Sequence, residues 1–153
     1  MTVATWKPES TAPAGSAANR TIARLLRSKD TDLASVSERI ERGLAFRVFA
    51  DLCGKLGVTQ GEFAKLLRIS ESTLYRRKAA GRFEPDESDR LWRYLHLYAR
   101  AVEVHERPDA AVEWLRAPLP SLGGRAPLAV ARDDAGAQRV LAVLGRIEHG
   151  VFG

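Results

Sequence analysis

The chain has 153 residues, of which 45% are apolar, and a formal net charge of +5. This length predicts one or two small domains that can bury a core. No apolar run approaches the roughly 18 residues that a membrane span needs, and the first twenty residues lack the apolar stretch of a secretory signal. The single cysteine, Cys53, excludes a disulfide scaffold and a multi-cysteine zinc site. We therefore expect a cytoplasmic protein without a membrane partner.

The positive charge is concentrated in the middle of the chain. Residues 33–100 contain thirteen Lys or Arg against nine Asp or Glu, and residues 65–82 contain six basic side chains and one acid, Glu71. Such a local imbalance is typical of a surface that binds a polyanion such as nucleic acid. A solvated helix face without a partner is the alternative that charge alone leaves open.

The first half of the chain predicts a tail followed by a long helix. Residues 1–34 are expected to form a disordered or loosely ordered tail, because residues 1–19 are rich in small and polar residues without periodicity. Ser35 and Glu38 have the spacing of a capping box. Apolar residues at every fourth position then predict an amphipathic helix that ends at Gly57, with Gly43 as the point where it could be interrupted.

Helical signals continue to the end of the chain. Thr59 caps a short helix, Ser70 caps a third that ends at Gly81, and Pro85 opens a fourth that runs to about Glu106. This fourth helix is apolar nearly all round, which predicts that it packs on more than one neighbour. Short helices over about 108–115 and 127–131 follow, and a last helix is capped by Asp133 or Asp134 and ends at Gly150. No segment requires a strand, so we expect an all-α fold.

Residues 59–80 have the pattern of two short helices joined by a tight turn. Ala64 is small enough for the helices to cross closely, while apolar residues fix their angle. The pattern resembles a helix-turn-helix of the Xre/Cro-like kind. Two positions depart from it, because Arg68 occupies the turn where glycine is usual and Arg77 occupies a position that is usually apolar.

A helix-turn-helix reads base edges with its second helix in the major groove, while basic groups around that helix hold phosphates. Arg77 could serve there by bending outward. A helical hairpin that binds no DNA remains the alternative. The candidates for base contacts are Ser72, Tyr75 and Arg76, the candidates for phosphate contacts are Gln60, Arg77, Lys78 and Arg82, and Ser70 and Thr73 complete the DNA-binding set.

The region from residue 36 to the C-terminus carries a more specific resemblance, to the Xre/MbcA/ParS family of type II antitoxins. Several motifs occur in the order of that family. They are TLYRRK at 73–78, SDRL at 88–91, W-L-x-x-P-x-x-x-L-G-G-x-x-P at 114–127, G-x-x-x-V-x-x-x-L at 136–144 and RIEHGVF at 146–152.

The resemblance implies an antitoxin that binds and occludes the active site of a RES-domain, NAD-consuming toxin and represses its own operon by binding operator DNA. It divides the chain into a helical DNA-binding domain, 35–106, and a toxin-binding domain, 107–153. We expect a homodimer within a hetero-oligomeric complex, because one small DNA-binding module binds weakly. The expected toxin-binding residues are Arg125, Arg132, Arg146, His149, Gly150, Val151, Phe152 and Gly153.

No catalytic or metal-binding constellation is evident, so we expect no enzyme activity and no cofactor. His96 and His105 are nine residues apart on one predicted helix, too far for a helical metal-ligand pair. Cys53 belongs to an apolar helix face and is expected to be buried and inert. Two other functions stay open: a stand-alone transcription regulator whose C-terminal domain dimerises or senses a ligand, and an interaction module that has lost DNA binding. The last helix could also simply close the core.

Overall fold

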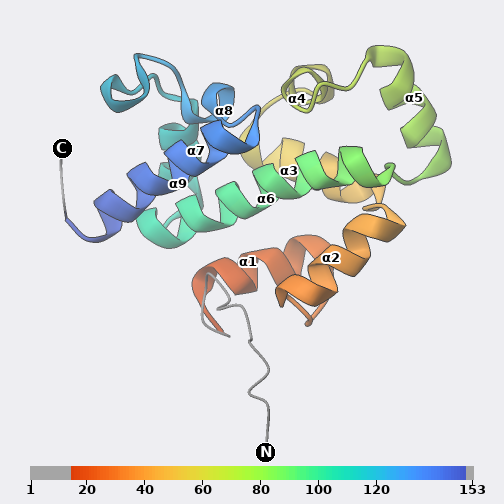
Figure 1. Cartoon of the computed structure of the whole chain (residues 1–153), viewed down its shortest axis with the longest axis horizontal. Coiled ribbons are helices and arrows are strands. Elements are labelled where there is room, and N and C mark those ends of the chain that lie inside the picture. The colour runs from red at the N-terminus through yellow and green to blue at the C-terminus, as the bar shows by residue number, and fades with distance from the viewer. Residues whose placement is uncertain (1–14, 151–153) are drawn as a thin grey trace, which may run out of the picture.

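The computed structural model describes residues 15–150 (Figure 1). Its regular elements in this range are all helices, and the only extended pairings there are two isolated antiparallel bridges, Ala45 with Arg82 and Leu119 with Arg125. The prediction of an all-α fold is confirmed. In chain order the elements are α1 (Ala17–Leu26), α2 (Leu33–Arg42), α3 (Phe46–Leu56), α4 (Gln60–Leu66), α5 (Glu71–Ala80), α6 (Pro85–His105), α7 (Pro108–Arg116), the 3-10 turn η1 (Pro120–Leu122), α8 (Pro127–Val130) and α9 (Asp134–Glu148).

Helix α6 is the centre of the molecule. It packs against α1 and α2 on one side and against α7 and α9 on the other. Figure 1 shows α6 running through the middle of the folded molecule. Ten of its 21 residues are buried. This arrangement confirms the expectation of a helix with more than one packing neighbour, since an apolar stripe on a single face would support only one.

The prediction of a loosely ordered N-terminal tail is wrong for residues 17–26, which the structure describes as a helix. Residues 17–26 form helix α1, which is capped by Ser16 and buries Ile22, Leu25 and Leu26. The buried positions of α1 run only from Ala18 to Leu26, little more than two turns and too short a pattern to distinguish from chance, and the helix is stabilised by packing on α6. The remainder of the predicted tail, residues 1–14, lies outside the described residues.

The amphipathic helix expected before Gly57 is interrupted at Gly43, the position that the sequence indicated for a break, and forms the two helices α2 and α3. Gly43 has a φ of 88°, and a Cβ at this position would lie 2.1 Å from the carbonyl oxygen of Phe83. The segment after Gly43 and the segment at Phe83 meet here in a short antiparallel pairing, in which the amide of Phe83 donates to the carbonyl of Leu44 at 2.9 Å. Glycine is required by this close approach, which no local pattern reveals.

The first cap of this region also differs from the prediction. Helix α2 begins after Asp32, whose carboxylate accepts from the amide of Ser35 at 2.9 Å. Ser35 is therefore inside the helix and does not cap it. The other predicted caps are confirmed, with Thr59 before α4, Ser70 before α5 and Asp133 before α9. Over the described range, no helix is both long and apolar enough to cross a membrane.

Candidate functional site

Helices α4 and α5 form the predicted hairpin, and α4 anchors it. Phe63 and Ala64 of α4 and Leu67 after it are buried. Arg68 in the turn has a φ of 57°, the left-handed conformation for which glycine is usual. The turn therefore has the left-handed backbone of a usual helix-turn-helix although an arginine occupies it. This conformation costs an arginine about 1–2 kcal/mol of conformational free energy relative to glycine.

Helix α5 has an outer face that the rest of the described chain does not cover. None of its residues is buried, Leu74 is only half-buried, and the side chain of Tyr75 is 77% exposed. Figure 1 shows α5 projecting at one end of the molecule. Because a helix without a buried residue adds little to the core, its exposed side chains are free to contact another molecule.

Arg77 holds α5 onto the start of α6. Its Nε lies 2.7 Å and its Nη2 3.2 Å from the two carboxylate oxygens of Glu87. Glu87 is 6% exposed and also accepts from the amide of Glu84, so one carboxylate caps α6 and binds α5. The bond to this carboxylate raises the pKa of Arg77. The usual apolar contact is thus replaced by an ion pair, and Arg77 does not bend outward to reach phosphate as expected.

The remaining candidates on α5 fall into two groups. Ser70 and Thr73 act locally, because the Ser70 hydroxyl accepts from the amide of Thr73 at 3.2 Å and donates to its Oγ1 at 2.9 Å. Thr73 Oγ1 in turn accepts from Nη2 of Arg76 at 3.1 Å, which steadies that side chain at the helix surface. The other members of the set on this helix are exposed; these are Ser72, Tyr75, Arg76 and Lys78.

Two candidates lie at the ends of the hairpin. Gln60 is the first residue of α4 and is half-buried. Arg82 follows α5 directly, is exposed, and donates from Nη1 to the carbonyl of Arg42 at 3.1 Å. The predicted DNA-contacting residues therefore all lie on one hairpin and the segment that follows it, and Arg77 differs in that its side chain pairs with Glu87 of α6.

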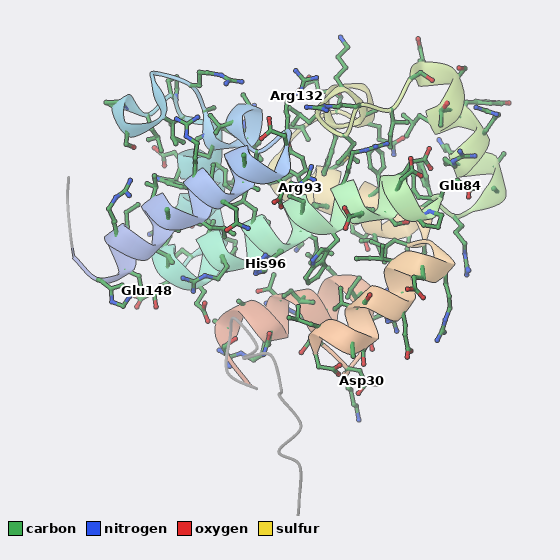
Figure 2. The ribbon with its side chains drawn as sticks, viewed as in Figure 1. Asp30, Glu84, Arg93, His96, Arg132 and Glu148 are labelled. Atoms are coloured by element: carbon green, nitrogen blue, oxygen red, sulfur yellow. The ribbon has the colours of Figure 1, made fainter. Side chains whose placement is uncertain are left out.

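The five predicted toxin-contacting residues that the structure describes are exposed but do not form one cluster. Arg125 donates to the carbonyl of Ala129, and Arg132 precedes α9, whereas Arg146, His149 and Gly150 are at the far end of α9. The 15 residues of α9 place Arg132 about 20 Å from the group at the far end of this helix. Figure 2 shows Arg132 and Glu148 at these separate ends. The other three expected residues, Val151, Phe152 and Gly153, lie outside the described residues.

An ion network that sequence reasoning missed fixes the end of α9. Arg100 of α6 bonds both Glu103 and Glu148, the latter at 2.5 Å between Nη2 and Oε2. Glu148 is the last residue of α9, so the network holds the point where the chain leaves the helix. Its partners are 48 residues apart, and no local motif could have indicated the pairing.

The structure also describes the surroundings of Cys53 and of the side chains that could bind a metal ion. Burial raises the pKa of the Cys53 thiol to about 12, so this side chain is an unreactive part of the core. In the range 15–150, no three His, Cys, Asp or Glu side chains lie together as metal ligands would.

Comparison with known proteins shows the family to which the chain belongs. The model of an antitoxin Xre-like helix-turn-helix domain matches residues 35–96, and that of an antitoxin Xre/MbcA/ParS C-terminal toxin-binding domain matches residues 100–150. A protein named Antitoxin Xre from Yersinia enterocolitica is 30% identical over 117 residues, which are 75% of this chain and 79% of the relative. The chain belongs to the Xre family of antitoxins. A second Antitoxin Xre, from Photorhabdus laumondii, is 31% identical over 94 residues, or 60% of this chain and 64% of that relative.

The Xre assignment gives the hairpin and the C-terminal helices their roles. Helices α4 and α5 belong to a helix-turn-helix domain, from which DNA binding follows, and α7 to α9 belong to a toxin-binding domain, which implies a toxin partner. Members of this family are antitoxins and not enzymes. The two matched segments meet within the continuous helix α6. The expected division between residues 106 and 107 stays a prediction.

Proposed function

We propose that this Xre antitoxin occludes the active site of a RES-domain, NAD-consuming toxin and represses its own operon by binding operator DNA through α5. It acts in the cytoplasm as a homodimer within a larger complex with the toxin. The observation that carries the proposal is the exposure of α5, a helix with no buried residue in a domain of the helix-turn-helix type.

The charge of the exposed face supports DNA binding. Arg76, Lys78 and Arg82 make no ion pair with any acid in the described part of the chain. Unpaired cations on one face favour phosphate, because each contact releases a counterion from the DNA. We assign Ser72, Tyr75 and Arg76 to base edges, and Gln60, Lys78 and Arg82 to the backbone.

The rigid end of α9 supports toxin binding. The Arg100 network fixes Glu148, and the chain then reaches Gly150, which has a φ of 70°. A short segment that starts from a fixed helix end loses little further freedom when it enters a pocket. We assign Arg146, His149 and Gly150, together with the sequence to Gly153, to the toxin interface, and Arg125 and Arg132 to a second contact.

Charge reversal on α5 tests the DNA-binding half of the proposal. In the full chain, Arg76→Glu with Lys78→Glu should weaken binding to the DNA upstream of its own gene by about a hundredfold, because two attractive contacts become repulsive. Fluorescence anisotropy at two salt concentrations measures this loss. The matched control, Arg107→Glu with Arg139→Glu, makes the same change in charge outside the hairpin and should retain most of the affinity. Equal binding by the wild type and the α5 variant would refute the assignment.

Co-purification tests the toxin-binding half. The tagged chain should retain a partner whose NAD⁺ consumption appears only after the antitoxin has been removed. Deletion of residues 150–153 should lower neutralisation of that partner while leaving DNA affinity unchanged. A chain that binds its own promoter as a clean dimer and retains no partner would instead support the stand-alone regulator.

A further inference from the structure

A small hollow beside the end of α5 is lined by an unusual number of arginines. Its volume is about 130 Å³, and Arg39, Arg42, Arg47 and Arg82 are four of the nine residues that line it. None of the nine is acidic. The hollow lies where the end of α2, the start of α3 and the segment after α5 meet.

Arg39 and Arg47 form the inner wall and are fixed by α1. Arg47 donates from Nη1 to the carbonyl of Leu25 at 3.2 Å and from Nη2 to that of Leu26 at 3.3 Å. Arg39 donates to the Leu26 carbonyl at 3.4 Å. These bonds satisfy the last carbonyls of α1. The dipole of α1 places about half a negative charge at this end of the helix, which offsets only part of the positive charge of Arg39 and Arg47.

Arg42 and Arg82 form the outer wall. Arg82 is held there because its guanidinium donates to the carbonyl of Arg42 and its backbone forms the bridge with Ala45. Arg42 pairs only with Glu38, at 3.4 Å, and the two side chains are 71% and 67% exposed. An ion pair that is so exposed is worth little and exchanges readily for a better anion.

The hollow therefore holds more positive charge than nearby acids balance. The only other ion pair of the four arginines joins Arg47 to Asp51 at 3.7 Å, and Arg39 and Arg82 have none with any residue of the described range. Burial lowers the pKa of Arg47, and repulsion by Arg27 and Arg39 lowers it further against the opposing effect of Asp51. Crowded like charges of this kind are relieved by a bound anion.

We infer that this hollow binds a phosphate of the DNA backbone beside the groove that α5 enters. The inference rests on the proposed binding of DNA by α5. The ligand is a phosphodiester of DNA rather than a free ion, because Arg82 directly follows Gly81, which ends α5. A helix in the major groove is flanked by phosphate contacts from the segments next to it. Of the four arginines in the hollow, the sequence indicated only Arg82 as a phosphate contact, and the site adds Arg39, Arg42 and Arg47.

The test removes charge from the outer wall, since Arg39 and Arg47 also hold α1. Binding of the full chain to two 30-base-pair duplexes, one from upstream of its own gene and one unrelated, is measured across a salt series. Because Arg82 is already assigned to the backbone, Arg82→Gln alone is the reference for the test. Arg42→Gln with Arg82→Gln should lower affinity about tenfold for both duplexes, and should lower it further than Arg82→Gln alone does. It should also reduce the slope of log K against log salt by about one, the value for one phosphate contact. The control Arg107→Gln with Arg139→Gln should leave the slope unchanged.

The outcomes separate this inference from the proposed function. If the double variant keeps the wild-type slope while the α5 charge reversal abolishes binding, neither the hollow nor Arg82 contacts DNA, and the proposed binding of DNA through α5 stands without them. If the wild type itself binds neither duplex, both are overturned. Thermal melting with inorganic phosphate then identifies a free-anion site if only the wild type is stabilised.

Should the double variant fail to melt cooperatively, Arg42→Gln alone is used, since its only ion pair within the described residues is the exposed one with Glu38. An unchanged slope in that variant would also overturn the inference.

Discussion

Helices α5 and α6 are adjacent in the chain but differ in almost every physical respect. Ten residues of α6 are buried and the helix contacts both halves of the molecule, whereas α5 has no buried residue. Helix α5 is attached by half-buried Leu74 and by the ion pair between Arg77 and Glu87. The difference teaches that stability rests mainly on α6 while the proposed recognition of DNA rests on α5, so we expect substitutions to affect the two properties to different degrees.

The largest effect should come from truncation in α6. Leu95 is 0% exposed, and Leu95→Ala should lower the free energy of unfolding by roughly 2–5 kcal/mol because it leaves a cavity. Urea denaturation measures this change. Leu74→Ala on α5 is the matched comparison and should lower it by only about 1 kcal/mol, since that side chain is half-buried. If the two variants were equally destabilised, the contrast between the helices would fail.

A smaller effect is expected where the two helices join. Glu87→Gln keeps the shape of the side chain but removes the charge that holds Arg77, so α5 should loosen while α6 remains folded. DNA affinity should fall about threefold to tenfold, equivalent to about 0.7–1.4 kcal/mol, and amide exchange in α5 should accelerate. Asp86→Asn is the control, because Asp86 is exposed and lies 3.9 Å from Arg90. Equal DNA affinities for the two variants would show that the pair does not position α5.

The smallest effect should be a dependence of stability on pH that originates in α6. Burial and the neighbouring charge of Arg100 lower the pKa of His96, and burial lowers that of His105, below the ordinary value of 6.5. The unfolded chain therefore binds more protons in this range, and stability should fall as pH drops from about 7 through 6.5 and below. Urea midpoints at pH 7.5 and 5.5 measure the loss, which His96→Gln should reduce. A midpoint that is higher at pH 5.5 would contradict the direction.

The sequence predicts the elements that local chemistry determines. Thr59, Ser70 and Asp133 cap the helices that they were expected to cap, since a cap needs only a side chain and an amide three residues away. The apolar faces of α6 likewise indicated its central place.

The features that the sequence did not predict depend on distant partners. Helix α1 is stabilised by α6, and the amide of Ala18 donates to Glu103 across 85 residues. The sequence indicates a break at Gly43 but not the approach of the chain at Phe83 that requires glycine there. Arg77 suggested a phosphate contact because nothing local showed that Glu87 would turn toward it. The candidate DNA face was found from the motif, but the hollow of four arginines required the fold.

The shared carboxylate of Glu87 has a consequence for any transfer of α5 between relatives. Glu87 both caps the start of α6 and anchors Arg77, so the two positions depend on each other. A foreign α5 with an apolar residue at position 77 would leave a buried carboxylate without its cation, which is strongly unfavourable. If α5 reads the operator as proposed, we expect its preference to be exchangeable at outward positions such as 72, 75 and 76, and a graft that includes position 77 must bring its own residue for position 87.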